Sequence, residues 1–410
     1  MAALGALAAT LSGCGGSADG GAGSGGSLVI ALNVPRSSDR PVADTITRGA
    51  DLAVKAINAA GGIEVGDATY TLSLKTYDDG GDPQRAAAND QTAIDAGAVA
   101  IIEDGVGAAI SGPRGQAAGV PEIATANGLS SLTGGAHPSV FRLGIGNDAA
   151  ASVLATYVGS HKRGTVAIVH DDTADGRDAA SLLAQDLPTV SVSVGPNVEI
   201  AAAAPAVDAP LTAISQARVS AVIVWGGDAF VARVLTAARS AGSALPFYTG
   251  PSGESPVVRQ LAGGAAEGLY LVAARMTSES DAEGFGKFEH RLAAAEGGPI
   301  DAGVKNAAGE EIRQPADTDF YAYDAVRLVA EALKKSATPR AGKPLLDAFT
   351  SVSVTSANGD HRGFRPDTHE GIADGDLYIA QIHDNQFQPV KDEPLSATLP
   401  EADEILADFH

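Results

Sequence analysis

The chain has 410 residues, with 28 lysines and arginines against 50 aspartates and glutamates, which gives a formal net charge of −22. A chain this acidic lacks the basic surface of a nucleic-acid-binding protein, and its apolar runs are shorter than the roughly 18 to 20 residues of a membrane-spanning helix. Its length indicates two to three globular domains at about 150 residues each. The single cysteine, Cys14, excludes an internal disulfide and any metal site built on several cysteines.

The N-terminal segment has the composition of an anchor. Residues 1–13 are rich in alanine and leucine and carry no charge, and Leu11-Ser12-Gly13 precedes Cys14. This pattern resembles the lipobox of bacterial lipoproteins, in which the cysteine sulfur takes a diacylglycerol group. We therefore expect residues 1–14 to be a signal segment that is truncated at its start, and the Gly/Ser-rich residues 15–26 to be a flexible tether. The alternative is a free, buried cysteine.

From residue 28 the pattern alternates between strands and helices. Residues 28–34 form a continuous apolar run, typical of a strand that is covered on both faces. Residues 46–57 carry apolar side chains at helical spacing, and Gly61-Gly62 ends that helix. Asp82-Pro83 begins a second helix, which ends at Gly97. Further strands are expected at residues 69–75, 99–102 and 120–125.

After residue 142 the alternation starts again. Three helices are expected: one that begins at Ala149, a second that ends at about Leu187, and a third from Ala229 to Gly242. Strands are expected at residues 165–170, 219–225, 247–249 and 268–273. This alternation predicts an α/β fold of parallel sheets flanked by helices, in two units of similar plan.

No motif indicates catalysis, a cofactor or a metal. The glycines at 105, 107 and 112 form neither a dinucleotide-binding nor a phosphate-binding motif, and Ser252 lacks the second half of a nucleophile elbow. His170-Asp171-Asp172 could ligate a metal, but no second histidine stands at ligand spacing, and a hydrogen-bonded turn is the more common role of such a segment. We therefore expect a protein that is not an enzyme.

Short motifs follow one another in a fixed order along the chain. They are Arg48-Gly49-Ala50-Asp51-Leu52-Ala53-Val54, Ile57-Asn58-Ala59-Ala60-Gly61-Gly62-Ile63, Tyr77-Asp78-Asp79, Asp82-Pro83, His137-Pro138, Phe141-Arg142, Val166-Ala167-Ile168-Val169-His170-Asp171, Gly226-Gly227, Thr249-Gly250-Pro251, Ala265-Ala266-Glu267-Gly268 and Tyr323-Asp324-Ala325-Val326. This order and spacing resembles the solute-binding proteins of branched-chain amino-acid ABC importers, the Leu/Ile/Val-binding type, over about residues 27–385.

The resemblance implies a type I periplasmic-binding-protein fold, in which two doubly wound parallel-sheet lobes are joined by three crossovers and close on a ligand. Lobe 1 would comprise residues 27–143 with 274–372, and lobe 2 residues 144–273 with 373–395. The crossovers would lie near Arg142, Ala274 and Gly371, and residues 396–410 would be a C-terminal extension. The ligand would bind between the lobes, beyond the carboxyl ends of the strands.

The resemblance also implies where the ligand binds in lobe 1. In the family, the loop after the fourth strand offers small hydroxyl residues to the ligand carboxylate. Here that loop has no hydroxyl before Ser111, so the backbone N–H groups of Gly107 and Ala108 would donate instead. In the next loop Asn127 and Gly128 take the place of the family's Ala-Thr contacts.

In lobe 2, Asp175 stands where the family has a tyrosine over the ligand, and Asp228 where an aromatic residue is common. Ser252 replaces the acid that binds the ligand ammonium group, and Glu254 follows two residues later. The resemblance therefore implies a site that has lost aromatic walls and gained carboxylates.

Two interpretations of these acids stay open. Either they line the cleft and favour a ligand with one or more amines, or they lie at its rim and the ligand is an ordinary amino acid or small carboxylate. In both cases we expect a monomeric, lipid-anchored, extracytoplasmic protein that delivers a small polar ligand to an ABC-importer permease. The alternatives are a ligand-sensing module with the same fold and an α/β enzyme, for which the sequence offers no nucleophile–base pair.

Overall fold

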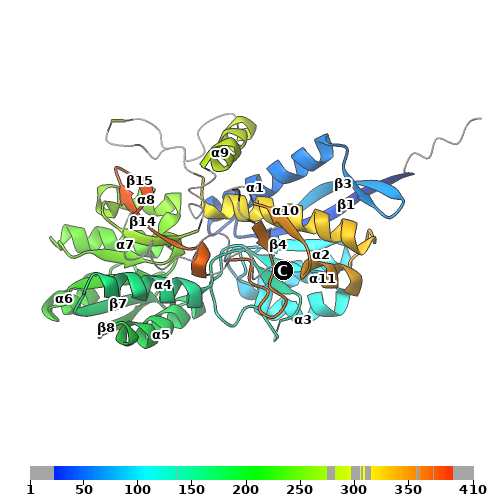
Figure 1. Cartoon of the computed structure of the whole chain (residues 1–410). Helices are drawn as coiled ribbons and strands as arrows, with labels where there is room; N and C mark the ends of the chain where they lie inside the picture. Colours follow the sequence, from blue (N-terminus) through cyan, green and yellow to red (C-terminus); the bar gives the residue numbers. More distant parts are fainter. Residues whose placement is uncertain are drawn as a thin grey trace, which may run out of the picture.

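The computed structural model describes residues 23–135, 137–274, 282–296, 305, 308–309, 315–356, 359, 361–372 and 374–390. These residues form two lobes, each built on one sheet with helices on both faces (Figure 1). The expected signal segment with Cys14, most of the expected tether and the expected C-terminal extension lie outside the described residues. None of the described helices is both long and apolar enough to cross a membrane.

The first sheet has six strands in the order β2-β3-β1-β4-β5-β6. Neighbouring strands pair in parallel, except that β2 and β3 are antiparallel. The strands are β1 (Gly23–Val34), β2 (Ile63–Val65), β3 (Ala68–Asp78), β4 (Ala100–Glu103), β5 (Glu122–Ala124) and β6 (Val140–Arg142). The helices on this sheet are α1 (Arg40–Ala59), α2 (Pro83–Asp95), α3 (Ala108–Ala118), α10 (Asp317–Ser336) and α11 (Lys343–Phe349).

The apolar run of β1 is explained by helices on both faces of the sheet. Ile30 and Leu32 are buried in the core that contains α1 and α10, whereas Ala31 packs with Ala93 of α2 on the opposite face. Side chains of a strand alternate between faces, so a strand covered twice is apolar throughout. This confirms the interpretation of residues 28–34 as a doubly covered strand.

The second sheet has seven strands in the order β15-β14-β11-β10-β9-β7-β8. Its strands are β7 (Thr165–Asp171), β8 (Ser193–Ile200), β9 (Ala221–Trp225), β10 (Phe247–Thr249), β11 (Tyr270–Ala273), β14 (Tyr378–His383) and β15 (Gln386–Pro389). β14 and β15 are antiparallel to their neighbours, so both sheets have an antiparallel edge that the expectation of parallel sheets did not include. The helices on this sheet are α4 (Asn147–Ser160), α5 (Ala174–Thr189), α6 (Asp208–Gln216), α7 (Asp228–Ser240) and α8 (Pro256–Ala262).

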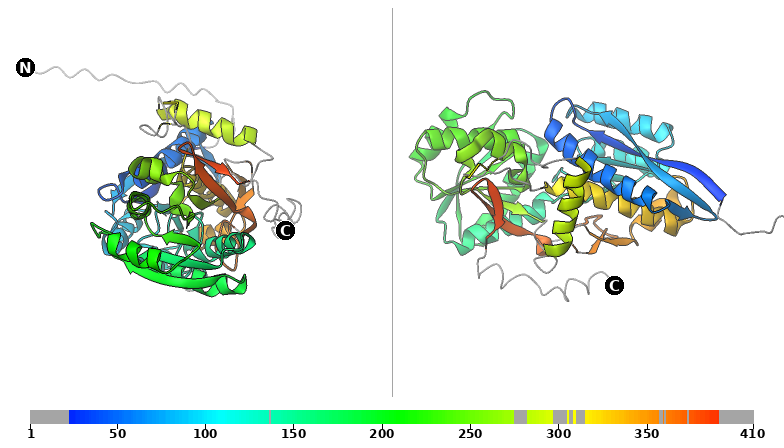
Figure 2. Two further views of the ribbon diagram at one scale, coloured as in Figure 1. Left: turned by 90° about the vertical axis from the view of Figure 1, so that its left-hand side faces the viewer. Right: turned by 90° about the horizontal axis from the view of Figure 1, so that it is seen from above.

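Smaller elements complete the chain. They are the 3-10 helices η1 (Pro251–Glu254), η2 (Gly263–Ala266) and η4 (Asp374–Asp376), the hairpin of β12 (Ser353–Thr355) and β13 (His361–Gly363), and α9 (Ala282–Glu296). Helix α9 lies across α1 (Figure 2), and the ring of its Phe288 lies 5.2 Å from that of Tyr323 in α10.

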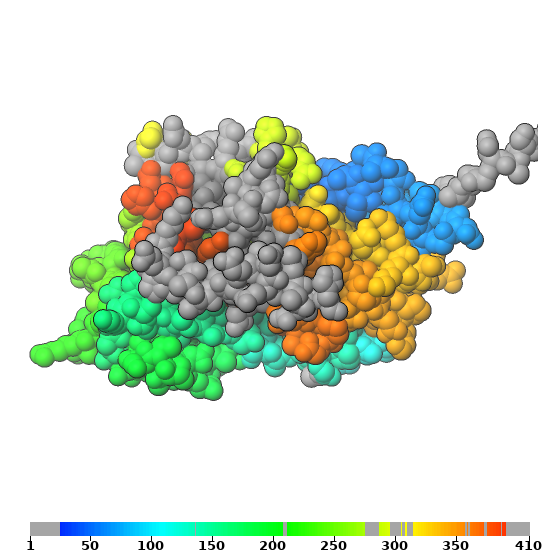
Figure 3. Space-filling model, viewed as in Figure 1, coloured from blue at the N-terminus to red at the C-terminus, as the bar shows by residue number. Residues whose placement is uncertain are grey.

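The chain passes between the sheets after β6, after β11 and before β14. Two of these passages lie side by side, because the Arg142 N–H donates to the carbonyl oxygen of His369 and the Gly371 N–H to that of Arg142. The buried Arg142 guanidinium also pairs with Glu370, at 2.7 Å between Nη2 and Oε1. Figure 3 shows the result on one face, where the red strands near the C-terminus lie over the second lobe and the orange segment before them over the first.

Several local expectations were wrong. Strand β1 begins at Gly23 and pairs Gly23 with Ala68, so residues 23–26 belong to the sheet and not to a tether. Helices α3 and α6 and strand β8 had not been expected. Two of these elements contain residues that are unfavourable in regular structure. Gly112, Pro113 and Gly115 lie inside α3, and Gly195 and Pro196 lie inside β8.

Candidate functional site

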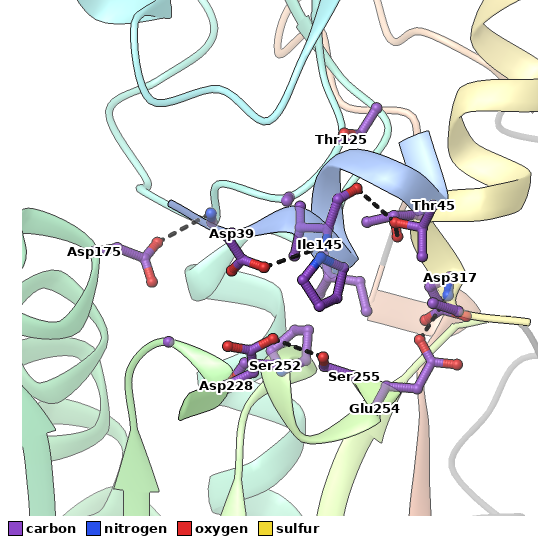
Figure 4. Close-up of a pocket in the computed structure, with 18 of the residues that line it drawn as sticks. Asp39, Thr45, Thr125, Ile145, Asp175, Asp228, Ser252, Glu254, Ser255 and Asp317 are labelled. Carbon is purple, nitrogen blue, oxygen red and sulfur yellow. Dashed lines mark hydrogen bonds between the residues drawn. The ribbon is translucent and has the colours of Figure 1, made fainter. Parts of the chain in front are cut away.

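A cavity of about 210 Å³ lies between the lobes, at the carboxyl ends of the central strands (Figure 4). Lobe 1 contributes the start of α1, the loop after β5 and the start of α10, and lobe 2 the start of α5, the turn after β9 and η1. The lining residues are Asp39, Pro41, Val42, Thr45, Thr125, Ala126, Gly128, Ile145, Asn147, Asp175, Trp225, Gly226, Gly227, Asp228, Pro251, Ser252, Glu254, Ser255, Pro256, Ala316, Asp317, Thr318 and Tyr321. This is the edge at which open α/β sheets bind ligands.

Part of the cavity wall is aromatic. Trp225, the last residue of β9, and Tyr321, in the second turn of α10, both line the cavity, as does Ile145. The expectation of a site without aromatic walls was therefore wrong, because these rings come from positions other than those the resemblance had suggested. Trp225 is the single tryptophan of the chain and ends an apolar strand, a signal that could have identified it.

On the side of lobe 1, the carboxyl group of Asp39 lines the cavity. Its Oδ1 accepts a hydrogen bond from the Val42 N–H at 3.3 Å, so Asp39 is the N-cap of α1. Burial is the main cause that raises the pKa of this half-buried carboxyl group to about 6, and the negative charge of Asp228 in lobe 2 is the second cause. Asp39 and Asp228 therefore interact electrostatically across the cavity (Figure 4).

On the side of lobe 2, Asp228 is the first residue of α7 and is almost fully buried. Its carboxylate accepts hydrogen bonds from the Ser255 hydroxyl at 2.7 Å and from the Ala229 N–H at 2.6 Å. Burial raises the pKa of Asp228 despite these two donors. The two hydrogen bonds thus fix the position of the Asp228 carboxylate. Because it is desolvated, a positively charged partner would stabilise its ionised form.

Asp175, in the first turn of α5, connects the lobes directly. Its Oδ1 accepts the Gly128 N–H of lobe 1 at 3.0 Å and the Asn147 side-chain amide at 3.1 Å. Burial raises the pKa of Asp175 to about 6. The hydrogen bond to Gly128 can form only while the lobes are close together.

The far end of the cavity is formed by η1 and the start of α10. The Asp317 N–H donates to Glu254 Oε2 at 2.8 Å, and the Tyr321 hydroxyl donates to Asp317 Oδ2 at 3.3 Å. Burial raises the pKa of Tyr321 well above 10, and the charges of Asp317 and Glu254 add to the effect. The Tyr321 hydroxyl therefore stays protonated and acts as a donor.

The structure brings five of the eight predicted ligand-binding residues to this cavity and leaves three outside it. Gly128, Asp175, Asp228, Ser252 and Glu254 line it. Gly107 instead is the N-cap of α3 and lies close to Ala86 of α2, and Ala108 is buried in a small apolar cluster with Ala124. The Asn127 amide donates to the Gly105 carbonyl group and its oxygen accepts from the Leu129 N–H, so Thr125 and Ala126 line the cavity in its place.

Sequence reasoning missed several lining residues, among them Asp39, Thr45, Thr125, Asp317 and Tyr321. Asp39 precedes Pro41 and a helix with apolar periodicity, which is an N-cap signal. Such a signal identifies a helix start but not what the free carboxylate oxygen faces. Asp317 and Tyr321 reach the site from a helix far along the chain, and no local pattern marks them.

Two groups of residues bear on metal binding. His170 and Asp171 are the last residues of β7, and Asp171 Oδ1 accepts from the Thr173 hydroxyl and N–H and Asp171 Oδ2 from the Gly227 N–H. Separately, oxygen atoms of Asp90, Glu103 and Glu122 lie within 4.8 Å of one another, buried between the first sheet and α2. Burial raises the pKa of all three groups, so protons alone can neutralise them.

Comparisons with known proteins agree with this architecture. Residues 27–386 match the family model described as Periplasmic binding protein. A type 1 periplasmic binding protein from Bordetella pertussis Tohama I has a TM-score of 0.76 and 19% identity, over 89% of this chain and all of the other. No curated protein sequence matches the chain.

Two similar structures were solved with ligands. LivJ, the branched-chain amino-acid binding protein of Streptococcus pneumoniae, was solved with isoleucine and has a TM-score of 0.74 and 20% identity, over 88% of this chain and 98% of its own. A solute-binding protein of an ABC transporter from R. palustris was solved with benzoate. It has a TM-score of 0.74 and 18% identity, over 89% of this chain and 95% of its own. At these identities the likeness establishes the fold.

Proposed function

This chain belongs to the periplasmic binding protein family, and from that premise we propose that it is of the Leu/Ile/Val-binding type, captures a small polar, amino-acid-like ligand between its lobes and delivers it to an ABC-importer permease. It acts outside the cytoplasm, held to the membrane by a lipid on Cys14. It binds and releases its ligand without chemical change.

The observation that carries this proposal is that both lobes line one cavity. Asp39 and Thr125 come from lobe 1, and Asp228 and Ser252 from lobe 2. A ligand that touches both lobes favours the closed state by the free energy of the contacts it makes only there. Closure can thereby report to the permease that the site is loaded.

The proposal is supported by the ligands of similar proteins. Isoleucine and benzoate, bound by the two relatives described above, are both small organic molecules. A cavity of about 210 Å³ is smaller than the pockets of roughly 300 to 1,000 Å³ that hold drug-sized molecules, so it favours a small ligand.

The test is a ligand screen by thermal unfolding. The purified chain is unfolded and refolded to remove any bound molecule, and amino acids, amines, small carboxylates and purines are then added at millimolar concentration. A ligand at 1,000 times its dissociation constant should stabilise the protein by about 4 kcal/mol, which raises the melting temperature by several degrees. Small-angle scattering on the same samples should show compaction. No response to any compound class would contradict the proposal.

A further inference from the structure

We propose that the ligand carries a net positive charge on one or more amines, and that a cationic amine seated between Asp39 and Asp228 is what permits the lobes to close. This inference rests on the proposed function and names its ligand class. It follows from the charges around the cavity, the hydrogen-bond donors around it and the position of the two acids on opposite lobes.

The charged side chains that line the cavity are all acidic. Asp39, Asp175 and Asp228 line it, while none of the lining residues that the structure describes is a lysine, arginine or histidine. Within the described part of the chain, these three carboxyl groups accept hydrogen bonds from uncharged groups and form no ion pair. A partly desolvated carboxylate is stabilised most by a cationic hydrogen-bond donor, and here the ligand is the group that can provide one.

Several of the donors that an anionic ligand would need are engaged within the protein. The Gly128 N–H donates to Asp175, the Gly227 N–H to Asp171 and the Ser255 hydroxyl to Asp228. A ligand carboxylate entering the cavity would therefore meet carboxylates and donors that already have acceptors. Uncompensated burial of a charge is costly, so the site selects against anions.

The hydroxyl groups of lobe 1 are engaged in the same way. The Thr125 hydroxyl donates to the Glu103 carbonyl oxygen at 2.8 Å. Thr45 Oγ1 donates to the Val42 carbonyl oxygen and lies 2.7 Å from Thr318 Oγ1, so the second hydroxyl can donate to the first. The cavity thus offers acceptors to a ligand more readily than donors.

The position of the acids connects charge to closure. Asp39 belongs to lobe 1 and Asp228 to lobe 2, and the two line one cavity from opposite sides (Figure 4). Like charges brought together by closure repel, and this repulsion opposes the closed state while the cavity holds no cation. An ammonium group between them replaces repulsion by two attractions, one to each lobe.

The remaining wall suits the hydrocarbon part of such a ligand. Trp225, Tyr321 and Ile145 line the cavity beside the acids. Aromatic faces attract ammonium groups and pack against methylene groups. The geometry therefore favours a compact amine with a short hydrocarbon chain over a bulky polar molecule.

The experiment compares ligands of similar size and different charge on the stripped full chain. The probes are 1,5-diaminopentane, lysine, isoleucine, glutarate and benzoate, each measured by titration calorimetry. We expect the cationic amines to bind at least tenfold more tightly than isoleucine, and glutarate and benzoate to give no heat of binding. Small-angle scattering should show compaction with the amines alone.

Variants identify the acids responsible. Asp39→Asn retains the cap of α1, since asparagine caps helices as well as aspartate does, and Asp228→Asn retains the acceptor for Ser255. Each should weaken amine binding at least tenfold. Asp67→Asn, which removes an exposed charge from the turn between β2 and β3, should leave it unchanged. Circular dichroism checks that every variant is folded.

The two proposals fail separately. If isoleucine, glutarate or benzoate binds more tightly than the amines, or if neither Asn variant affects amine binding, the charge inference is wrong and the solute-binding function stands. If no compound of any class binds, both are contradicted.

Discussion

Glu103 is the least compensated carboxyl group that the structure describes in lobe 1. It is fully buried at the end of β4, and neither of its carboxylate oxygens has a hydrogen-bond partner among the described residues. Glu122, on the next strand, accepts the Ser111 hydroxyl, yet burial raises its pKa to about 8. Asp90 of α2 completes the group, and burial raises its pKa to about 6. Near neutral pH the Glu122 carboxyl group is therefore mostly protonated, whereas Asp90 is mostly ionised.

This arrangement predicts that the protein loses stability as the pH rises. The folded-state pKa of Glu122 lies above its unfolded value of 4.5, so between about pH 4.5 and 8 the folded state binds more protons and the free energy of unfolding falls with pH. Glu122→Gln should remove part of this dependence and stabilise the protein by about 1 to 3 kcal/mol at pH 8, with little effect at pH 5. Urea unfolding at both pH values measures it.

Glu64→Gln, on the exposed face of β2, is the matched control and should change stability by less than about 0.5 kcal/mol at either pH. If Glu122→Gln destabilises the protein at pH 8 instead, the Glu122 carboxylate is ionised and compensated there, and the assignment of a proton to it is wrong.

At the scale of elements, α1 and α10 approach each other closely at Gly49. A Cβ atom on Gly49 would lie 1.9 Å from the carbonyl oxygen of Asp319. Beside it, Arg48 Nη2 donates to Asp319 Oδ2 at 2.7 Å, and this carboxylate is fully buried. The pair of Arg48 and Gly49 thus sets the distance between the helices and the position of Asp317, which lines the cavity two residues before Asp319.

Gly49→Ala should therefore destabilise the protein by about 1 to 3 kcal/mol, because the added methyl group overpacks the contact between the helices. Helix propensity alone predicts the opposite, because alanine is favoured over glycine in a helix interior by about 1 kcal/mol. The sign of the change in urea unfolding decides between them, and a stabilised variant would show that the helices can separate without cost. Ligand affinity should fall as well, since α10 carries Asp317.

The strands with strong apolar runs, β1, β7 and β9, and the helices with clear caps could be predicted from the sequence, because burial on both faces and capping leave local signals. Helix α3 could not, since Gly112 and Pro113 are breakers by propensity and tertiary packing overrides them. For the cavity, Asp175 and Asp228 follow strands, and their place in its lining could be predicted. Asp39 was missed, because its role depends on Asp228, a residue far away in the sequence.

At the scale of the whole molecule, closure is held by carboxylates of α5 that bind the loop after β5. Asp178 Oδ2 accepts the Ser130 N–H at 2.9 Å and its Oδ1 accepts the Ser130 hydroxyl at 2.7 Å. The Asn147 amide, at the passage between the lobes, donates to Asp178 at 3.1 Å. Asp178 does not line the cavity, so these contacts stabilise the closed state without touching the ligand.

Asp178→Ala should consequently weaken ligand binding by shifting the lobes toward the open state. Two hydrogen bonds between the lobes, one of them from a backbone N–H to a charged group, contribute about 1 to 3 kcal/mol together. Because the apparent dissociation constant rises as the closed fraction falls, we expect a loss of affinity of roughly tenfold. At a ligand concentration that compacts the unmodified chain, small-angle scattering should show a larger radius of gyration for the variant, and saturating ligand should restore the closed value.

Asp172→Ala is the matched control, because the Asp172 carboxylate accepts the Ala202 N–H within lobe 2. It removes the same charge and one backbone hydrogen bond but no contact between lobes, so affinity and radius should match those of the unmodified chain. If the two variants lower affinity equally, the effect of Asp178 comes from the charge of lobe 2 as a whole. A radius that grows in Asp178→Ala alone would assign it to the contact with Ser130.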